Sequence, residues 1–170
     1  NGTLWHGERC KAGEFGHMTI YPEGELCGCG KSGCLEAHCS GTAIVRMARD
    51  AAVRYQPSAL RAYSSNLSAI TPEIVYNCAI GGDTASRDIF LSMSKGLAIA
   101  MANVNNLLDI EVFIVGGGIS RAYDFFAPMV ISEVDKRVFS VARGNIRIIR
   151  ATLGNNAGLL GAGSLALDML

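Results

Sequence analysis

Hydrophobic residues recur at helical spacing through the middle of the chain. Between residues 84 and about 108 they fall three or four positions apart, which places them on one face of a helix. These apolar positions are Ile89, Phe90, Met93, Leu97, Met101, Val104 and Leu108. Asp83 precedes the stretch and is a residue type that caps helices well. The later half is largely apolar, so we expect a long, central and buried helix.

Two further segments carry helix signals. Residues 35–54 show an apolar stripe at helical spacing, and Ser40-Gly41-Thr42 interrupts it, with Ser40 as a cap for the second part. Thr71-Pro72-Glu73 combines a capping residue, a proline at the first helical position and an acidic first turn. A helix therefore begins there and stops at Gly81-Gly82. Residues 57–68 have no periodicity and are expected to form a loop.

Strand and helix patterns alternate in the last third of the chain. Residues 110–115 form a nearly continuous apolar run, as expected for a strand that is covered on both faces. The run ends in Gly116-Gly117-Gly118, and an amphipathic helix is expected from about residue 123 to 138. Residues 146–151 predict another strand, and residues 157–169 a final helix. The sum is an α/β lobe with a mixed sheet flanked by helices.

The first residues carry a turn signal. Asn1-Gly2 is typical of a type I′ hairpin turn, yet no strand precedes it. We therefore expect that an amino-terminal part of the protein comes before this chain, although a start chosen without regard to a hairpin is the alternative. Residues 3–5 would be the returning strand, with Trp5 in the core. A short strand is expected at residues 17–21.

Length and charge narrow the choice of function. The 170 residues are in the size range of one domain. Lys+Arg and Asp+Glu are both 15, and a net charge of zero argues against a face that binds nucleic acid. No run approaches the roughly 18 apolar residues that span a bilayer, and no signal peptide is evident. We expect a cytoplasmic protein without a membrane partner.

One histidine and three cysteines fall close together in the sequence. His17, Cys27, Cys29 and Cys34 suit a tetrahedral zinc site with three thiolates and one imidazole. The glycines among the cysteines allow the tight bend that this requires. The alternative is a set of buried thiols with an unrelated histidine, and the spacing departs from the usual C-x-x-C pairs. We favour zinc, because a glycine-rich loop is a poor place to bury three thiols.

Three cysteines remain outside this loop, namely Cys10, Cys39 and Cys78. An odd number fits poorly with a secreted disulfide scaffold and well with a reducing cytosol. We therefore expect these three residues to be unpaired and mostly buried thiols.

Two carboxylates flank the predicted zinc loop. Glu14 precedes His17 by three residues, and Glu36 follows Cys34 by two. A rigid loop would hold both where they can accept hydrogen bonds from the hydroxyls of a polyol. The alternative is a pair of solvated surface glutamates. His38 is close enough to Glu36 to approach such a site, although an isolated helical histidine is more often structural or solvated.

The order of these motifs resembles the ROK family (repressors, open reading frames and sugar kinases). The matching segments cover nearly the whole chain and comprise Glu14-Phe-Gly-His17, the cysteine loop at 27–34, Glu36-Ala-His-Cys-Ser-Gly41, and residues 113–120 and 153–162. The family belongs to the actin-like superfamily, with a hexokinase-type, ribonuclease H-like fold. The resemblance implies that residues 1–170 are a single carboxy-terminal lobe with a zinc loop at 17–34.

The resemblance also assigns roles to residues. Glu14, His17 and Glu36 should contact sugar hydroxyls, and His17 would also ligate a structural zinc ion. The glycines 116–118 should line an adenosine pocket within the segment 111–120. Without the resemblance, a plain strand–helix turn would be the better interpretation, since there is no Walker lysine and no G-x-G-x-x-G.

The implied enzyme is an ATP- and Mg-dependent hexose kinase, either glucokinase-like or acting on an N-acetylhexosamine. Its phosphate loops and catalytic aspartate would lie in an amino-terminal lobe that this chain lacks. We therefore assign no catalytic residue here, and we expect the isolated chain to be inactive. The Gly/Ala-rich and Leu-rich helical surfaces make a homodimer a reasonable expectation.

Two other interpretations stay open. The chain is alternatively the effector-binding part of a ROK-type repressor that responds to a sugar, and only then would nucleic acid be a partner. A repressor would place a helix-turn-helix before this segment. The third interpretation is a zinc-stabilised oligomerisation module that binds no ligand and would show no stabilisation by sugar.

Overall fold

The computed structural model describes residues 4–168, and the expectations for Asn1-Gly2, Thr3 and Met169 lie outside this range. Six helices and two strands are found there: α1 (Leu35–Cys39), α2 (Gly41–Arg54), α3 (Pro72–Ile80), α4 (Thr84–Leu108), β1 (Val112–Val115), α5 (Tyr123–Val134), β2 (Arg147–Arg150) and α6 (Ala157–Asp168). Short 3-10 turns connect them. Residues 57–68, expected as a loop, contain one such turn at Ala59–Tyr63 and the start of a second at Leu67–Ala69.

Helix α4 is the central element, as its apolar pattern predicts. Helices α1, α2, α3 and α5 all contact it, and its buried face includes Phe90, Met93 and Met101. Asp83 caps it by accepting a hydrogen bond from the Ser86 amide (2.9 Å), and it also accepts one from the Ala59 amide of a preceding loop (2.8 Å). Partial burial raises the pKa of the Asp83 carboxyl, but hydrogen bonds from the Ser86 hydroxyl, the two amides and the Ser58 hydroxyl outweigh burial, and the pKa is lowered overall.

Helices α2 and α3 begin directly after their predicted capping residues. Ser40 accepts a hydrogen bond from the Ala43 amide and separates α1 from α2. Thr71 accepts from the Ile74 amide at the start of α3, with Pro72 at its first position. Helix α5 ends at Val134, four residues before the expected boundary.

Strands β1 and β2 pair in parallel, with Phe113 opposite Ile148. Helix α5 packs against β2, and the Tyr123 hydroxyl donates a hydrogen bond to the Ile148 carbonyl at 2.5 Å. The opposite face of this sheet is open, because Ile114 is 70% exposed and its neighbour Ile149 is exposed as well. The expectation that β1 is covered on both faces is therefore wrong for the described residues, and the antiparallel part of a mixed sheet stays a prediction.

The amino-terminal segment differs from the expectation. Trp5 is 78% exposed, because residues 4–13 run away from the helices and nothing in the described part of the chain covers its ring. Residues 4–6 form no strand, and Phe15–His17 is a 3-10 turn that replaces the start of the strand expected at 17–21. Only an isolated antiparallel bridge, Thr19 to Cys34, remains of that strand.

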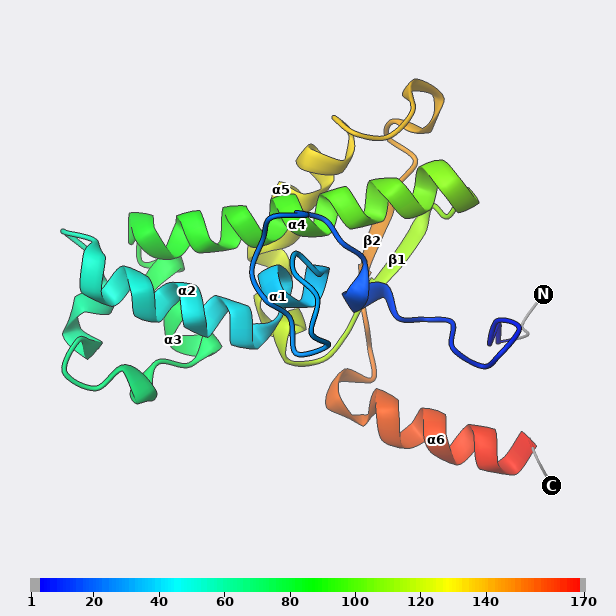
Figure 1. The fold of residues 1–170 in the computed structure, drawn as a ribbon, viewed down its shortest axis with the longest axis horizontal. Helices are drawn as coiled ribbons and strands as arrows, with labels where there is room; N and C mark the ends of the chain where they lie inside the picture. Colours follow the sequence, from blue (N-terminus) through cyan, green and yellow to red (C-terminus); the bar gives the residue numbers. More distant parts are fainter. Residues whose placement is uncertain (1–3, 169–170) are drawn as a thin grey trace.

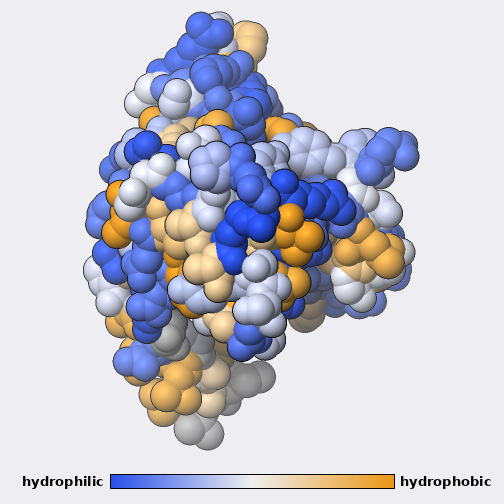
Figure 2. All heavy atoms as spheres, turned by 90° about the vertical axis from the view of Figure 1, so that its left-hand side faces the viewer, coloured by the Kyte–Doolittle hydropathy of each residue, from blue (hydrophilic) through white to orange (hydrophobic). Residues whose placement is uncertain are grey.

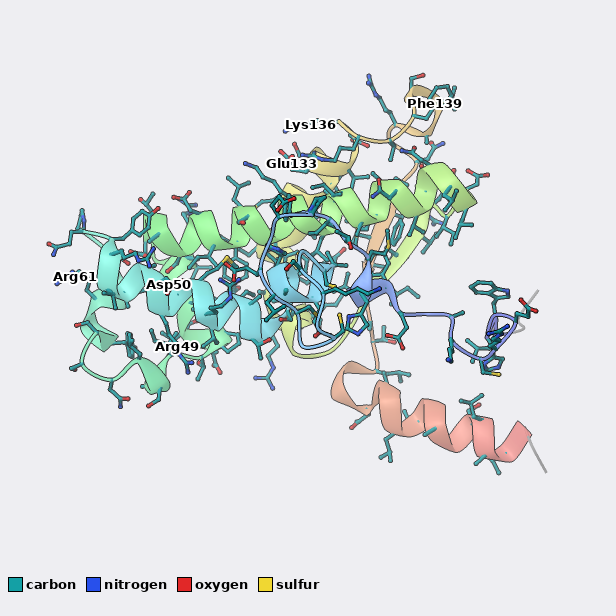
Figure 3. All side chains as sticks on the ribbon, in the orientation of Figure 1. Arg49, Asp50, Arg61, Glu133, Lys136 and Phe139 are labelled. Carbon is teal, nitrogen blue, oxygen red and sulfur yellow. The ribbon has the colours of Figure 1, made fainter. Side chains whose placement is uncertain are left out.

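Two regions project from the helical body. Helix α6 lies apart from the other helices in Figure 1, and its leucines, such as Leu159, are exposed. At the end of α5, Lys136 and Arg137 both pair with Glu133 at 2.6 Å, and the exposed Phe139 follows in the connection to β2 (Figure 3). Neither region contains a residue that the sequence assigns to the site.

The face of the molecule drawn in Figure 2 has no extended apolar belt. Figure 2 shows the face at the left-hand end of Figure 1, where hydrophilic residues separate several smaller apolar patches. Among residues 4–168, no helix is both long and apolar enough to cross a bilayer. All six cysteines are free of disulfide bonds; of the three outside the loop, Cys39 is buried, Cys78 is half-buried, and Cys10 is exposed, contrary to expectation.

The cysteine loop folds back on itself before α1. Leu26 and Ser32 form an antiparallel bridge, and the Cys27 amide donates a hydrogen bond to the Lys31 carbonyl at 2.8 Å. Gly33 has a φ of +76°, and a Cβ at this position would overlap the carbonyl oxygen of Tyr21. The loop therefore requires glycine at position 33 for its backbone angle and for this close approach.

Gly33→Ala should destabilise the chain by about 2 kcal/mol or more, because a left-handed conformation alone costs about 1–2 kcal/mol with a side chain present. The overlap with Tyr21 adds to that cost. Chemical denaturation of both proteins measures the difference in unfolding free energy.

Gly28→Ala is the matched control, because a Cβ at Gly28 meets no atom within 4 Å. It should change the free energy by no more than about 0.5 kcal/mol. Equal stability of the two variants would contradict the role given to Gly33.

Candidate functional site

His17, Cys27, Cys29 and Cys34 come together as the sequence predicts. Their ligand atoms all lie within 4.8 Å of one another, and no other such cluster occurs in residues 4–168. Cys27 Sγ is 3.7 Å from His17 Nδ1, and Cys29 Sγ is 3.6 Å from Cys34 Sγ. Sulfur ligands of tetrahedral zinc, with bonds of about 2.3 Å, lie about 3.8 Å apart. The cluster therefore has dimensions that fit a tetrahedral metal ion.

Three local elements position these four side chains. His17 ends the 3-10 turn Phe15–His17, Cys27 and Cys29 flank Gly28 in the loop, and Cys34 is the cap residue of α1. Cys27 and Cys34 are buried, whereas Cys29 and His17 face solvent. The cluster thus joins the surface of the loop to its interior.

The surroundings shift the pKa values of the Cys34 and Cys29 thiols in opposite directions. Burial raises the pKa of the Cys34 thiol to about 11, and its hydrogen bonds with Cys29 and Cys27 add to the effect. The Lys31 backbone and then Cys34 donate to Cys29 and lower the pKa of its thiol. Without a cation, one buried thiol thus stays protonated. A bound metal would displace that proton, since thiolate is the ligating form.

Glu14 and His17 form a pair at the edge of the cluster. Glu14 Oε2 is 3.7 Å from His17 Nε2, and the His17 side chain is 36% exposed. The imidazole therefore presents Nδ1 to Cys27 and Nε2 to the carboxylate. A histidine that ligates a metal through one nitrogen commonly donates from the other to an acceptor of this kind.

Glu36 lies in the first turn of α1. Its Oε1 is 3.9 Å from Cys27 Sγ, and its Oε2 lies against the backbone of Gly16. Glu36 is exposed and borders a hollow of 180 Å³ that Ser40 and Arg46 also line. The predicted residues Glu14, His17 and Glu36 are thus gathered around the cysteine loop, with their polar atoms accessible.

A second cavity lies at the other end of α1 and has a volume of 570 Å³. Gly118 and Arg121 form one wall, after strand β1, and Ser40-Gly41 and Tyr76 form others. Because α1 rises about 1.5 Å per residue, Glu36 and Ser40 are only about 6 Å apart along its axis. Ser40 lines both this cavity and the hollow beside Glu36, so the two hollows are neighbours.

The three glycines after β1 differ in their positions. Gly118 lines the cavity, but Gly116 and Gly117 do not; a Cβ at Gly116 would meet Ala151 after strand β2 at 3.4 Å. Sequence reasoning assigns no cavity to the walls from Ser40-Gly41 and α3, because in the sequence Ser40-Gly41 indicates only a helix cap and the end of the motif at 36–41, and α3 only a helix.

A hollow of 710 Å³ lies where α3 ends and α4 begins. None of the predicted site residues lines it, and its carboxylate, Asp83, already accepts four hydrogen bonds from neighbouring groups as the cap of α4. Size alone gives it no chemistry, so the smaller regions at the two ends of α1 are the candidate site.

Two of the known proteins that resemble this chain in sequence are named as sugar kinases. The chain is 33% identical over 166 residues to a glucokinase of Halalkalibacterium halodurans, with 97% of this chain and 50% of that protein covered. It is 30% identical over 162 residues to an N-acetylmannosamine kinase of Yersinia pestis, with 95% and 49% covered. The chain thus spans about half the length of these relatives.

Solved structures agree on the fold. A ROK family glucokinase from Streptomyces griseus, in complex with glucose and AMPPNP, matches with a TM-score of 0.79 and 31% identity, over 91% of this chain and 51% of that one. A ROK family transcriptional regulator, a homolog of the E. coli MLC protein, matches with a TM-score of 0.72 and 28% identity, over 82% and 34%. The actin-like fold class is therefore confirmed.

The sequence pattern of the family agrees with both comparisons and covers almost every residue. It matches residues 1–169. This protein belongs to the ROK family.

Proposed function

We propose that the chain is the carboxy-terminal lobe of an ATP-dependent hexose kinase, of the glucokinase or N-acetylhexosamine kinase type. The observation that carries this proposal is the grouping of Glu14, His17 and Glu36 around one Cys/His cluster. Relatives that are named as such kinases, and that are about twice as long, support it.

The cluster's role in this proposal is structural. His17, Cys27, Cys29 and Cys34 would supply all four ligands of a zinc ion, which leaves no position for a reactive water. The metal would hold the loop closed and fix the His17 ring. His17 Nε2 then remains available for a hydrogen bond to Glu14 or to a ligand hydroxyl.

The carboxylates would bind the sugar. An ionised carboxylate accepts hydrogen bonds from hydroxyls, and such charged hydrogen bonds are stronger than neutral ones. Glu14 approaches from the 3-10 turn, and Glu36 approaches from α1, so a hexose between them would meet acceptors on two sides. The hollow beside Glu36 gives room for part of the ring or a substituent.

The cavity beside Gly118 would take the nucleoside of ATP. Tyr76 and Phe90 give it aromatic surface, and Arg121 adds a positive group at its wall. A largely apolar cavity with a few polar groups is the usual form of a cofactor site. In this proposal Gly116 and Gly117 act by letting the backbone turn after β1, while Gly118 contacts the nucleoside.

Phosphoryl transfer also needs groups that hold the phosphates and Mg²⁺ and that orient the attacking hydroxyl. We place these in an amino-terminal lobe of the full-length protein, and we expect the isolated chain to be inactive. The open face of the sheet around Ile114 supports this division, because an apolar face of this kind needs a covering element.

The ROK regulator among the similar structures favours one alternative, namely the effector-binding part of a sugar-responsive repressor. The same carboxylates would then bind an effector sugar without phosphorylating it. The two functions differ in the residues before this segment, where a kinase has phosphate loops and a repressor has a DNA-binding helix pair. A homodimer is compatible with both functions.

The purified chain should contain one zinc ion, and Cys34→Ser should lose it. Removing a buried thiolate ligand leaves three ligands and an open position, so both metal content and thermal stability should fall. Metal analysis of the dialysed proteins and thermal melting with and without a chelator measure the two effects.

Cys10→Ser is the control, because Cys10 is an exposed thiol outside the cluster. It should keep its zinc and its melting temperature. Zinc content below half an equivalent in the unmodified chain, or equal content in both variants, would contradict the structural zinc site.

In the full-length protein, Glu36→Gln should raise KM for the hexose about 10- to 100-fold, because a hydrogen bond to a charged group contributes about 1.5–3 kcal/mol. KM for ATP should stay within about twofold, since Glu36 does not line the nucleoside cavity. Steady-state kinetics with glucose and with N-acetylmannosamine measure both values.

Glu23→Gln gives the matched comparison, because Glu23 is an exposed glutamate of the same loop region. Its kinetic constants should equal those of the unmodified protein. A hexose KM unaffected by Glu36→Gln would remove the sugar-binding role, and hexose binding without any phosphorylation would favour the repressor.

A further inference from the structure

His38 packs between α1 and the turn that precedes the cysteines. The Glu25 amide donates a hydrogen bond to His38 Nε2 at 3.3 Å. The ring meets Tyr21 edge-on, with ring centroids 4.9 Å apart. It also lies so close to Gly24 that a Cβ there would overlap Nε2. The imidazole thus fills the space between the helix and the turn.

Glu25 connects this turn to three other parts of the fold. Its amide bonds to His38 on α1, and its carbonyl accepts from the Gly33 amide at 2.8 Å. Its carboxylate pairs with Arg46 of α2 at 3.0 Å. Arg46 in turn donates to the Ala37 carbonyl at 3.2 Å. The backbone at Glu25 is therefore held from α1, from the loop and from α2.

The position of this turn determines where Cys27 lies. Only Leu26 separates Glu25 from Cys27, and Cys27 Sγ is 3.9 Å from Glu36 Oε1. Glu36 and His38 share the short helix α1. A shift of the turn relative to α1 would therefore change the spacing between the cluster and the carboxylate proposed to bind sugar.

We propose that His38 is a positioning residue for the sugar site: its neutral imidazole fixes the turn 21–25 against α1, and protonation releases that turn. The part that concerns sugar rests on the function proposed above. The bond requires Nε2 to be an acceptor, which only the neutral ring with its proton on Nδ1 provides. A protonated ring would aim a second N–H at the Glu25 amide.

The charged and titratable groups that face His38 are Arg46, Glu25 and Tyr21. Burial lowers the pKa of His38 below its ordinary value of 6.5, Arg46 lowers it further, and Glu25 opposes both. Burial raises the pKa of Tyr21, so its ring stays neutral. Because the folded-state pKa is depressed, the contribution of His38 is complete above pH 6.5 and is lost as pH falls through the folded-state value.

Three variants separate the hydrogen bond from the ring and from titration. His38→Gln places an amide oxygen near Nε2 and does not titrate. His38→Phe keeps an aromatic ring against Tyr21 but has no acceptor. His6→Gln removes a different histidine, which is exposed in the amino-terminal segment, and serves as the control.

The first measurement is hydrogen exchange of the Glu25 amide in the zinc-loaded 170-residue chain, corrected for intrinsic exchange. Protection should fall about three- to tenfold between about pH 7.5 and about pH 5.5 in the unmodified chain and in His6→Gln. It should be high at both values in His38→Gln and low at both in His38→Phe. Wild-type protection in His38→Phe would overturn the proposal.

The second measurement is KM for glucose in the full-length protein over the same pH range. KM should rise about three- to tenfold on acidification in the unmodified protein, and this rise should be absent in His38→Gln, with kcat affected less. The wild-type pH dependence of KM in His38→Gln would overturn the link from the turn to the sugar site. If no hexose binds but exchange behaves as expected, the proposed function fails while His38 keeps its role in the turn.

Discussion

The arrangement of the candidate site depends on one constraint, which is that three thiols and an imidazole lie within 4.8 Å of one another. Two of these thiols are buried, and such a cluster of potential thiolates is stable only when protonated or when bound to a cation. The constraint fixes more than the loop. His17 ends the turn that begins after Glu14, and Cys34 caps the helix that carries Glu36. Whatever closes the cluster therefore sets the distance between the two carboxylates.

The cluster is also tied to the core through α1. The Cys39 thiol donates a hydrogen bond to the Met93 carbonyl of α4 at 3.3 Å, and burial raises its pKa to about 12, so it remains a protonated donor. A Cβ on Gly96 of α4 would lie 2.6 Å from Cys39 Sγ and 3.0 Å from Ile20 Cδ1. Helix α4 thus packs closely against both the loop and α1. Because α4 is buried in a close-packed core, it holds the surface loop in a fixed position.

Local signals predicted the parts of the fold that depend on neighbouring residues. Asp83, Thr71 and Ser40 are capping residues whose side chains accept the expected amide hydrogen bonds, so three helix starts were predicted correctly. The Cys/His spacing likewise predicted which side chains meet. Burial of Trp5 and the covered sheet were predicted wrongly, because these properties depend on partners distant in sequence or outside the described residues. The cavity walls at Ser40 and Tyr76 depend on the packing of three separate segments, which no local pattern encodes.

X-ray absorption at the zinc edge is the decisive measurement of this metal site, because it reports the atoms bound to the metal. A closed structural site should show three sulfur ligands at about 2.3 Å and one nitrogen at about 2.0 Å, unchanged when glucose is added. A shell with an oxygen ligand, with fewer than three sulfurs, or with a ligand exchanged on addition of glucose would contradict it. Such a result would mean that the loop does not hold Glu14 and Glu36 through a closed, purely structural metal site.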